Sequence, residues 1–219
     1  MIEFTRGMFQ VSKAVVGTLM TNCYILTGKS DCLIVDPGNN GDYIVDLVKK
    51  HCADRSVNVL LTHGHFDHIM AVPDVCKAFS GAKIYMHESD KDFLTNPELN
   101  QSVEFGGEFK MPELTDRVRF LKESDPMVFG DLCFKVLEVP GHTPGSLAFY
   151  FPKESLLFSG DTLFRESIGG ATFPMSNEGN LMNSIKNKLM TLPNDTTVLP
   201  GHDSPTTIQH EKENNPFLG

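Results

Sequence analysis

The sequence has little positive charge and no concentrated stretch of it. Its 219 residues include 19 lysine and arginine side chains against 28 aspartate and glutamate side chains, a formal net charge of −9 at pH 7 with histidine neutral. A protein that binds a phosphate backbone needs a basic face to release counterions. The scattered lysines and arginines therefore argue against nucleic acid and against an anionic membrane surface as partners.

Two further patterns are missing. The five cysteines include no C-x-x-C pair, which excludes a zinc knuckle and a thioredoxin-type site. Most lie in apolar stretches such as Cys23-Tyr24-Ile25-Leu26, where a buried, reduced thiol is the expected role. No apolar run is long enough to span a membrane, and the first ten residues, with Glu3 and Arg6, lack a signal-peptide core. We therefore expect a cytoplasmic protein.

The chain also lacks an internal repeat, a low-complexity tract and a linker, so we expect residues 1–219 to form a single domain. Strand-like segments occur in two batches, each followed by helical segments, which favours two facing sheets with helices outside. The expected strands are 2–11, 23–27, 32–35, 57–61, 83–86, 118–121, 132–138, 146–151, 155–158 and 197–199. The expected helices are 42–51, 71–79, 88–94 and 178–190, and the segments 95–117 and 162–176 are read as connections.

Histidine and aspartate cluster where the expected strands end. Four such junctions stand out, namely His63-Gly64-His65-Phe66-Asp67-His68, Gly141-His142, Gly160-Asp161 and Gly201-His202. Strand ends of a layered α/β fold lie on one rim, where loops assemble sites. Three histidines and an aspartate that crowd together after a buried strand pack poorly in an apolar core, and burying their charges costs free energy. The pattern therefore predicts a functional site.

Metal binding explains why these residue types converge. Zinc prefers imidazole nitrogen and carboxylate oxygen, and a catalytic zinc keeps a position for water. On extended backbone His63 and His65 point to the same side, whereas Asp67 and His68 follow after the chain bends and can face a second ion. A carboxylate such as Asp161 can bridge two cations. The five histidines and two aspartates thus suit two ions and a shared hydroxide.

With these junctions the sequence resembles the metallo-β-lactamase-fold hydrolase superfamily, and most closely its short glyoxalase II-like branch. The resemblance rests on Thr62 to His68, on Pro140-Gly141-His142-Thr143-Pro144-Gly145-Ser146, on Ser159-Gly160-Asp161-Thr162-Leu163-Phe164, on Leu199-Pro200-Gly201-His202 and on Leu33-Ile34-Val35-Asp36-Pro37-Gly38. It implies a four-layer αββα sandwich with a dinuclear site at one edge.

The resemblance also implies a role for each residue of the site. The implied ligands are His63, His65 and His142 for the first ion, Asp67, His68 and His202 for the second, and Asp161 between them. Asp36 matches a position near the site, with a plain strand-ending turn as the alternative. Thr143 and Ser146 are expected to shape their loop, and His87 matches no ligand position.

The implied activity is hydrolysis of a small acyl-thioester or related ester by a hydroxide held between the ions. The implied cofactors are two divalent ions, zinc first, with iron or manganese as alternatives. Asp67 would also orient the hydroxide. If the leaving group is a thiolate, no strong general acid is needed.

Two departures from the branch bear on the substrate. Gly170 and Thr172 stand where the branch usually has arginine and aspartate, and Arg165 is the nearby candidate for substrate binding. The chain also ends without the helical C-terminal domain that grips glutathione in the longer enzymes, so no such domain is expected.

Rival interpretations differ at single positions. A β-lactamase is expected to have cysteine at Asp161, and a diiron oxygen-reducing protein a carboxylate at His65. A nuclease needs a basic surface. The main alternative is a persulfide dioxygenase with one iron bound by residues matching His63, His142 and Asp161, and a noncatalytic metal-binding scaffold comes after it.

Overall fold

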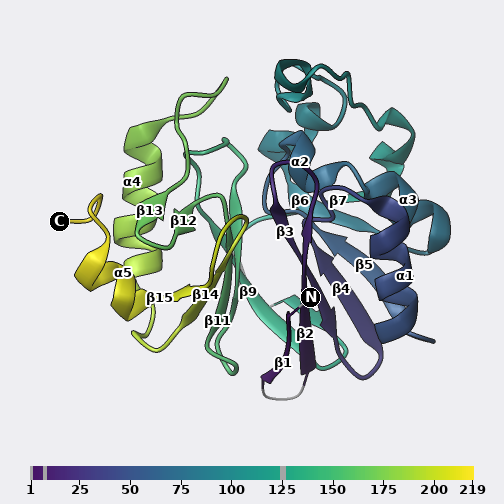
Figure 1. Ribbon diagram of the computed structural model, residues 1–219, viewed down its shortest axis with the longest axis horizontal. Coiled ribbons are helices and arrows are strands. Elements are labelled where there is room, and N and C mark those ends of the chain that lie inside the picture. The colour runs from purple at the N-terminus through teal and green to yellow at the C-terminus, as the bar shows by residue number, and fades with distance from the viewer. Residues whose placement is uncertain (1, 7–8, 124–126) are drawn as a thin grey trace.

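Two β-sheets face each other, and helices cover the outer face of each (Figure 1). The computed structural model describes residues 2–6, 9–123 and 127–219. The N-terminal half of the chain builds one sheet with its helices, and the C-terminal half builds the other. This arrangement confirms the αββα sandwich expected from the sequence.

The first sheet contains, within the described residues, seven strands in chain order. They are β1 (Ile2–Arg6), β2 (Phe9–Val16), β3 (Thr21–Thr27), β4 (Asp31–Val35), β5 (Ser56–Leu60), β6 (Ile84–His87) and β7 (Val118–Leu121). Neighbours from β1 to β4 are antiparallel, and those from β4 to β7 are parallel. Because parallel strands end on the same side, the segments that follow β4, β5 and β6 leave at one edge of the sheet.

The second sheet has the strand order β15-β14-β11-β10-β9-β8. Its strands are β8 (Met127–Phe129), β9 (Leu132–Glu138), β10 (Leu147–Phe151), β11 (Leu156–Gly160), β14 (Thr197–Pro200) and β15 (Thr206–Thr207). A separate hairpin of β12 (Leu163–Phe164) and β13 (Ser167–Ile168) follows β11. Since β11 and β14 are parallel, the segments after them also leave the sheet together.

The helices and the two sheets enclose three apolar layers. The α-helices are α1 (Gly41–His51), α2 (Phe66–Ile69), α3 (Val72–Ala78), α4 (Glu178–Asn187) and α5 (Ile208–Asn214). The 3₁₀ helices are η1 (Glu88–Leu94), η2 (Ser102–Phe105), η3 (Pro112–Arg117) and η4 (Leu189–Thr191). Helices α1 and α3 pack on the first sheet through residues such as Ile44 and Val75, and α4 and α5 pack on the second through Leu181 and Ile208. Buried aromatic rings, Phe134 among them, fill the space between the sheets.

The sequence missed several short elements. The connection 162–176 contains the β12–β13 hairpin, and the tail contains β15 and α5, none of which was predicted. Two-residue strands carry no periodicity that a sequence can display. The predicted strand 2–11 is two strands, β1 and β2, and its residues 7–8 lie outside the described residues.

The expectation of reduced cysteines is wrong for two of the five. Cys32 on β4 and Cys52 at the end of α1 form a disulfide. Cys23 and Cys76 are free and buried, as expected, and Cys133 is free and half-buried. The predicted cytoplasmic location thereby loses the support of five reduced thiols and stays a prediction. Within the described residues, no helix is both long and apolar enough to cross a membrane.

Candidate metal centre

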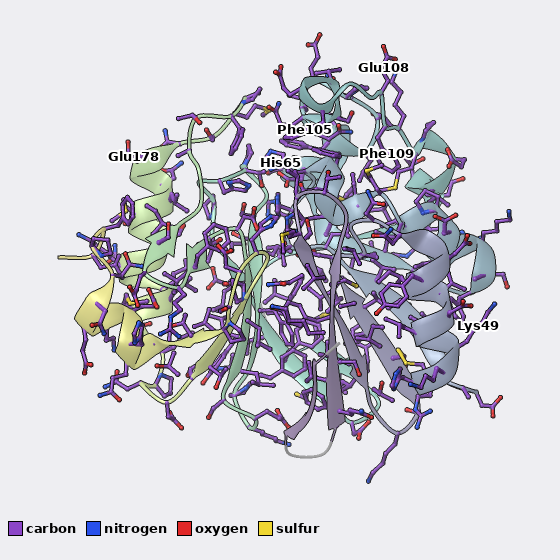
Figure 2. The ribbon with its side chains drawn as sticks, viewed as in Figure 1. Lys49, His65, Phe105, Glu108, Phe109 and Glu178 are labelled. Atoms are coloured by element: carbon purple, nitrogen blue, oxygen red, sulfur yellow. A yellow bond between two sulfur atoms is a disulfide. The ribbon has the colours of Figure 1, made fainter. Side chains whose placement is uncertain are left out.

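Four strand ends bring polar side chains to one edge where the two sheets meet. The end of β5 leads into the segment 62–68, and His142 lies in the loop between β9 and β10. Asp161 follows β11, and His202 follows β14. Figure 2 labels His65 at this edge, between the two halves of the molecule. All seven residues predicted as ligands converge here, since each belongs to one of the three groups of close ligand atoms.

The segment that follows β5 divides its side chains between two directions. His63 lies on non-helical backbone, and His65 is the extended N-cap of α2 (φ −67°, ψ 147°). Asp67 and His68 lie in the single turn of α2, after the bend that their spacing predicted. Gly64 has to be glycine, because a Cβ there would stand 2.5 Å from the Cβ of Phe93.

His63, His65 and His142 form the first group, called here the three-histidine group. Their candidate ligand atoms all lie within 4.8 Å of one another. Nδ1 of His65 lies 2.9 Å from Nε2 of His142. The three side chains are at most 4% exposed, and Nε2 of His63 and of His65 have no hydrogen-bond partner among the described residues. Buried nitrogens without a partner are costly unless a ligand satisfies them.

Asp67, His68 and His202 form the second group, called here the carboxylate group. Oδ2 of Asp67 lies 3.4 Å from Nε2 of His68 and 3.3 Å from Nε2 of His202. The two histidine Nε2 atoms are 3.3 Å apart. Each imidazole therefore faces both a carboxylate and the other imidazole, as side chains do when they surround a cation.

Asp161 lies between the two groups. Its Oδ1 is 3.4 Å from Nε2 of His68, and its Oδ2 is 3.3 Å from Nε2 of His202 and 3.6 Å from Nε2 of His142. Together with His63 and His68 it also makes a third set of close ligand atoms. Gly201 gives this carboxylate its space, since a Cβ there would stand 2.1 Å from Oδ1 of Asp161.

The two groups carry different charges in the metal-free protein. Burial lowers the pKa of His65 to about 3, and burial likewise lowers the pKa of His63 and His142. Burial opposes protonation of His68 as well, but the carboxylates of Asp67, Asp161 and Asp36 hold its pKa well above the usual value. For His202, burial is outweighed by hydrogen bonds to Asp161 and Asp67, which raise its pKa to about 10.

Residues behind the ligands fix their rings. Oδ2 of Asp36 lies 3.0 Å from Nδ1 of His68, and the same carboxylate accepts hydrogen bonds from the backbone N–H and the hydroxyl of Thr62. Asp36 is buried with φ of 50°, a costly left-handed backbone that the site's geometry holds in place. This contact decides in favour of the site role for Asp36 over a plain turn.

The same support recurs around the other ligands. Nδ1 of His142 lies 2.7 Å from the carbonyl oxygen of Gly170, and Nδ1 of His202 lies 3.0 Å from that of Leu19. The hydroxyl of Thr21 donates to Oδ2 of Asp67 at 2.8 Å. Such outer contacts set which imidazole nitrogen is left for a metal.

The sequence did not single out Asp90, although it connects two ligand-bearing loops. This fully buried aspartate on η1 accepts hydrogen bonds from the backbone N–H of Gly64, the hydroxyl of Thr143 and the backbone N–H of Gly145. Burial raises its pKa to about 6 against the effect of these donors. Ser146 donates to or accepts from Thr143 within the same loop, so both hydroxyls shape the loop as expected.

A cavity of about 130 Å³, called here the aromatic cavity, opens onto the site. Its apolar walls are Leu19, Phe66, Phe105 and Phe173. Phe105 is 57% exposed and Phe173 38%, unusual values for phenylalanine that place both rings at the mouth. In the part of the chain that the structure describes, no lysine or arginine lines this cavity.

The predicted substrate-binding candidate Arg165 does not reach this cavity. Its side chain is half exposed and stands 3.7 Å from the carboxylate of Glu166. Gly170 meets the site through its carbonyl oxygen, which binds His142, and Thr172 is exposed. None of these three residues therefore takes the place of the substrate-binding arginine that the glyoxalase II-like branch usually has.

The donor set fits divalent metal ions. Neutral imidazoles and ionised carboxylates are what zinc and its first-row neighbours bind, and the unpartnered Nε2 of His63 is an atom that an ion would satisfy. Such a centre beside an open cavity can activate water against a bound acyl group. An αββα sandwich with this centre defines a metal-dependent hydrolase.

The chain belongs to the metallo-beta-lactamase superfamily, whose family model matches residues 16–202. It is 36% identical to the "Probable metallo-hydrolase YqgX" of Bacillus subtilis over 93% of this chain and 94% of the relative. It is 33% identical to "Hydroxyacylglutathione hydrolase GloC" of Haemophilus influenzae over 93% and 95% of the two chains.

Two solved structures are similar over nearly their whole length. One is described as BLEG-1 B3 metallo-beta-lactamase, with a TM-score of 0.87, 36% identity and coverage of 95% of this chain and 99% of that one. The other is TTHA1623 in a di-iron-bound form, with a TM-score of 0.82, 34% identity and coverage of 94% and 100%. The fold expected from the resemblance is thus confirmed.

Proposed function

We propose that this chain is a dinuclear metallohydrolase that cleaves a thioester or a related ester of small size. The observation that carries the proposal is a pair of three-ligand groups with one carboxylate between them, beside a cavity with aromatic walls. The relative named hydroxyacylglutathione hydrolase supports the thioester.

The proposed ligands are the seven residues predicted from the sequence. The three-histidine group would hold one ion and the carboxylate group the other. Asp161 would be a ligand of both ions. Zinc is the first candidate, with iron or manganese as alternatives that accept the same nitrogen and oxygen donors. When bound, such ions polarise an acyl oxygen and bring the pKa of a water close to neutrality.

Asp67 would orient the attacking water. The hydroxyl of Thr21 fixes one of its oxygens, and the carboxylate also lines the aromatic cavity, where a water can donate to it. Phe105 and Phe173 would cover the bound acyl group and exclude bulk water.

The leaving group is proposed to be a thiolate. Within the described residues, every titratable side chain that lines the aromatic cavity is one of the proposed ligands, so no separate general acid stands ready to protonate an alkoxide. A thiolate needs no such acid. Small acyl-thioesters are therefore the proposed partners, whereas nucleic acid and membranes are not.

Metal analysis together with a substrate panel tests the proposal. We expect about two ions per chain by plasma emission spectrometry, and hydrolysis of some members of a panel of acyl-thioesters, with oxygen esters and penicillin as comparison substrates. His142→Ala should lose metal and activity, whereas His87→Ala, the matched variant of a strand-end histidine outside the site, should lose neither. Full activity of metal-free protein, or of metal-loaded His142→Ala, would contradict the proposal.

A further inference from the structure

A larger cavity adjoins the aromatic cavity on the other side of His202. Its volume is about 380 Å³, within the range of pockets that bind small molecules. Leu19 and His202 line both cavities, so the two meet at the carboxylate group. Because its other lining residues include Lys13, Asn22 and Ser204, we call it the lysine cavity. Nothing in the proposed hydrolysis uses these residues.

Lys13 is held at this cavity by the pairing of β2 with β3. Lys13 stands opposite Tyr24, and Val15 opposite Asn22, so these side chains share one face of the sheet. That face meets the loop after β14, where the hydroxyl of Tyr24 donates to the carbonyl oxygen of Pro200. A lysine on this face is consequently directed toward the segment that carries His202.

The ammonium group of Lys13 has no carboxylate partner in the described part of the chain. The residue is only 7% exposed, and Nζ donates to the backbone carbonyl oxygen of Asp203 at 2.8 Å. An ammonium has three donor positions, and its burial is costly, although the charge of Asp203, which also lines this cavity, offsets part of that cost. Burial accordingly lowers the pKa of Lys13, against the smaller opposing effect of Asp203.

Asn22 adds an acceptor beside this cation. Its Nδ2 donates to the carbonyl oxygens of Pro200 and Asp203, so Lys13 and Asn22 meet at the same oxygen of Asp203. Asn22 is only 1% exposed, and its buried Oδ1 has no hydrogen-bond partner among the described residues. A buried acceptor that lines a cavity without a partner indicates a donor supplied by a ligand.

The two cavities thus offer opposite chemistry on the two sides of the site. The aromatic cavity has apolar walls and, in the described residues, no lysine or arginine, whereas the lysine cavity has the ammonium of Lys13 and the acceptor of Asn22, with Asp203 also in its lining. An apolar acyl group fits the first cavity. The charged part of the same molecule is then left to the second.

We propose that the lysine cavity binds the leaving group of the substrate, with a carboxylate paired to Lys13 and a neighbouring N–H donating to Oδ1 of Asn22. The reaction in this inference rests on the proposed thioester hydrolysis, whereas the binding contacts of Lys13 and Asn22 do not depend on it. The inference assigns Lys13 and Asn22 as the residues that determine specificity for the leaving group.

A matched pair of substrates tests the proposal on the metal-loaded enzyme. One is S-phenylacetyl-N-acetylcysteine, and the other is its carboxamide, which keeps every group except the charge. We expect wild type to favour the carboxylate by about tenfold or more in kcat/KM, mostly through KM, since a charged hydrogen bond is lost in the carboxamide. Lys13→Met should abolish this preference and Lys13→Arg should keep part of it. Lys186→Met, which alters a lysine on α4 that lines a distant cavity, should retain it.

Damage to the fold would slow both substrates alike and leave their ratio unchanged, so the ratio isolates the charge. An unchanged preference in Lys13→Met, or no preference in wild type, would overturn the proposal.

A binding experiment separates this proposal from the proposed function. The thioether S-benzyl-N-acetylcysteine cannot be hydrolysed, and calorimetry on the metal-loaded protein measures its dissociation constant. We expect Lys13→Met and Asn22→Leu each to weaken its binding by about tenfold or more. If wild type cleaves no thioester but shows this pattern, the proposed function fails and the subsite stands. If binding is absent from wild type or equal in Lys13→Met, the subsite is overturned whether or not hydrolysis occurs.

Discussion

The three-histidine group and the carboxylate group lie side by side, yet the protein prepares them differently. His63, His65 and His142 are neutral and buried, and Nε2 of His63 has no hydrogen-bond partner among the described residues, which leaves it available to a cation. His68 and His202 instead hold protons that offset the carboxylates around them. One group is therefore ready for an ion, whereas the other must first give up protons.

This difference suggests an order of loading. An ion entering the three-histidine group meets lone pairs that are already free, whereas an ion entering the carboxylate group competes with protons on two imidazoles. The carboxylate group is also nearer to solvent, since the side chains of His202 and Asp67 are 21% and 14% exposed, whereas the residues of the three-histidine group are at most 4% exposed. We expect the three-histidine group to fill first and the carboxylate group second.

The largest effect is expected where the two groups cannot be separated. Asp161 touches ligands of both, so Asp161→Ala should reduce the occupancy of both ions and lower kcat/KM by about 10³-fold or more. Emission spectrometry and thioester hydrolysis, measured on the same preparation, check this. The circular dichroism spectrum should stay that of wild type. Loss of only one ion would contradict the position of Asp161 between the groups.

Single-ligand variants should separate the two groups. His142→Ala should empty the three-histidine group. His202→Ala should leave about one ion per chain, because the three-histidine group keeps all its ligands in that variant. Both should lose activity by about 10²-fold or more, since the proposed reaction uses both ions. A titration with zinc that shows two equal sites in His202→Ala would refute the distinction.

Substitution of Asp36, which supports His68 in the carboxylate group, should have a smaller effect that falls mainly on the second ion. Asp36→Asn replaces the oxygen that faces Nδ1 of His68 and should weaken the second ion by about 10- to 100-fold. The first ion should bind nearly as in wild type, because in the described structure Asp36 forms no hydrogen bond with the three-histidine group and reaches His63 only through the hydroxyl of Thr62, which lies 3.1 Å from Nδ1 of His63. Competitive titration with a chromogenic chelator measures both constants, and equal weakening of the two ions would show a general loss of structure instead.

Acid should act on one group and spare the other. Because the pKa of His202 is raised to about 10, its proton is present at pH 7 and must leave when an ion binds. Affinity for the second ion should therefore fall by about tenfold or more per unit as pH drops from 8 to 6. The pKa of His65 is lowered to about 3, so the first ion should bind equally well across this range. Calorimetry in buffers of different ionisation enthalpy counts the protons, and equal release for both ions would contradict the comparison.

Much of the site could be predicted because its ligands occur in short, dense motifs. His63 to His68 lie within one strand end and one helical turn, and the glycines beside His142, Asp161 and His202 mark strand ends. The same strand pattern predicted two facing sheets. In these cases the information is local, since a few neighbouring residues determine both the backbone and the direction of the side chains.

The unpredicted features depend on contacts between distant segments. The hydrogen bond from Lys13 to Asp203 joins residues 190 apart in sequence, and Asn22 meets the same loop. Cys32 and Cys52 meet only because α1 returns its end to β4. Asp90 is one of several acidic residues in its segment, and only the folded chain shows that it is fully buried between two loops.

Asp90 supports the three-histidine group as Asp36 supports the carboxylate group, and its expected effect on activity at pH 7 is the smallest. Burial raises its pKa from 3.8 to about 6, so between these values the folded chain keeps a proton that the unfolded chain has lost. The stability contributed by this proton is complete below about pH 4 and is lost as pH rises through 6.

The free energy of unfolding of metal-free wild type, relative to Asp90→Asn, should therefore fall by up to about 3 kcal/mol from pH 4 to pH 7. Urea denaturation of both proteins at several pH values measures this difference, in which the histidines common to both cancel. The carboxyl group accepts from Gly64, between His63 and His65, and from Gly145, just after His142. If the free energies of unfolding of the two proteins change in parallel with pH, the pKa of Asp90 is not raised, and Asp90 does not support the three-histidine group as a protonated acid.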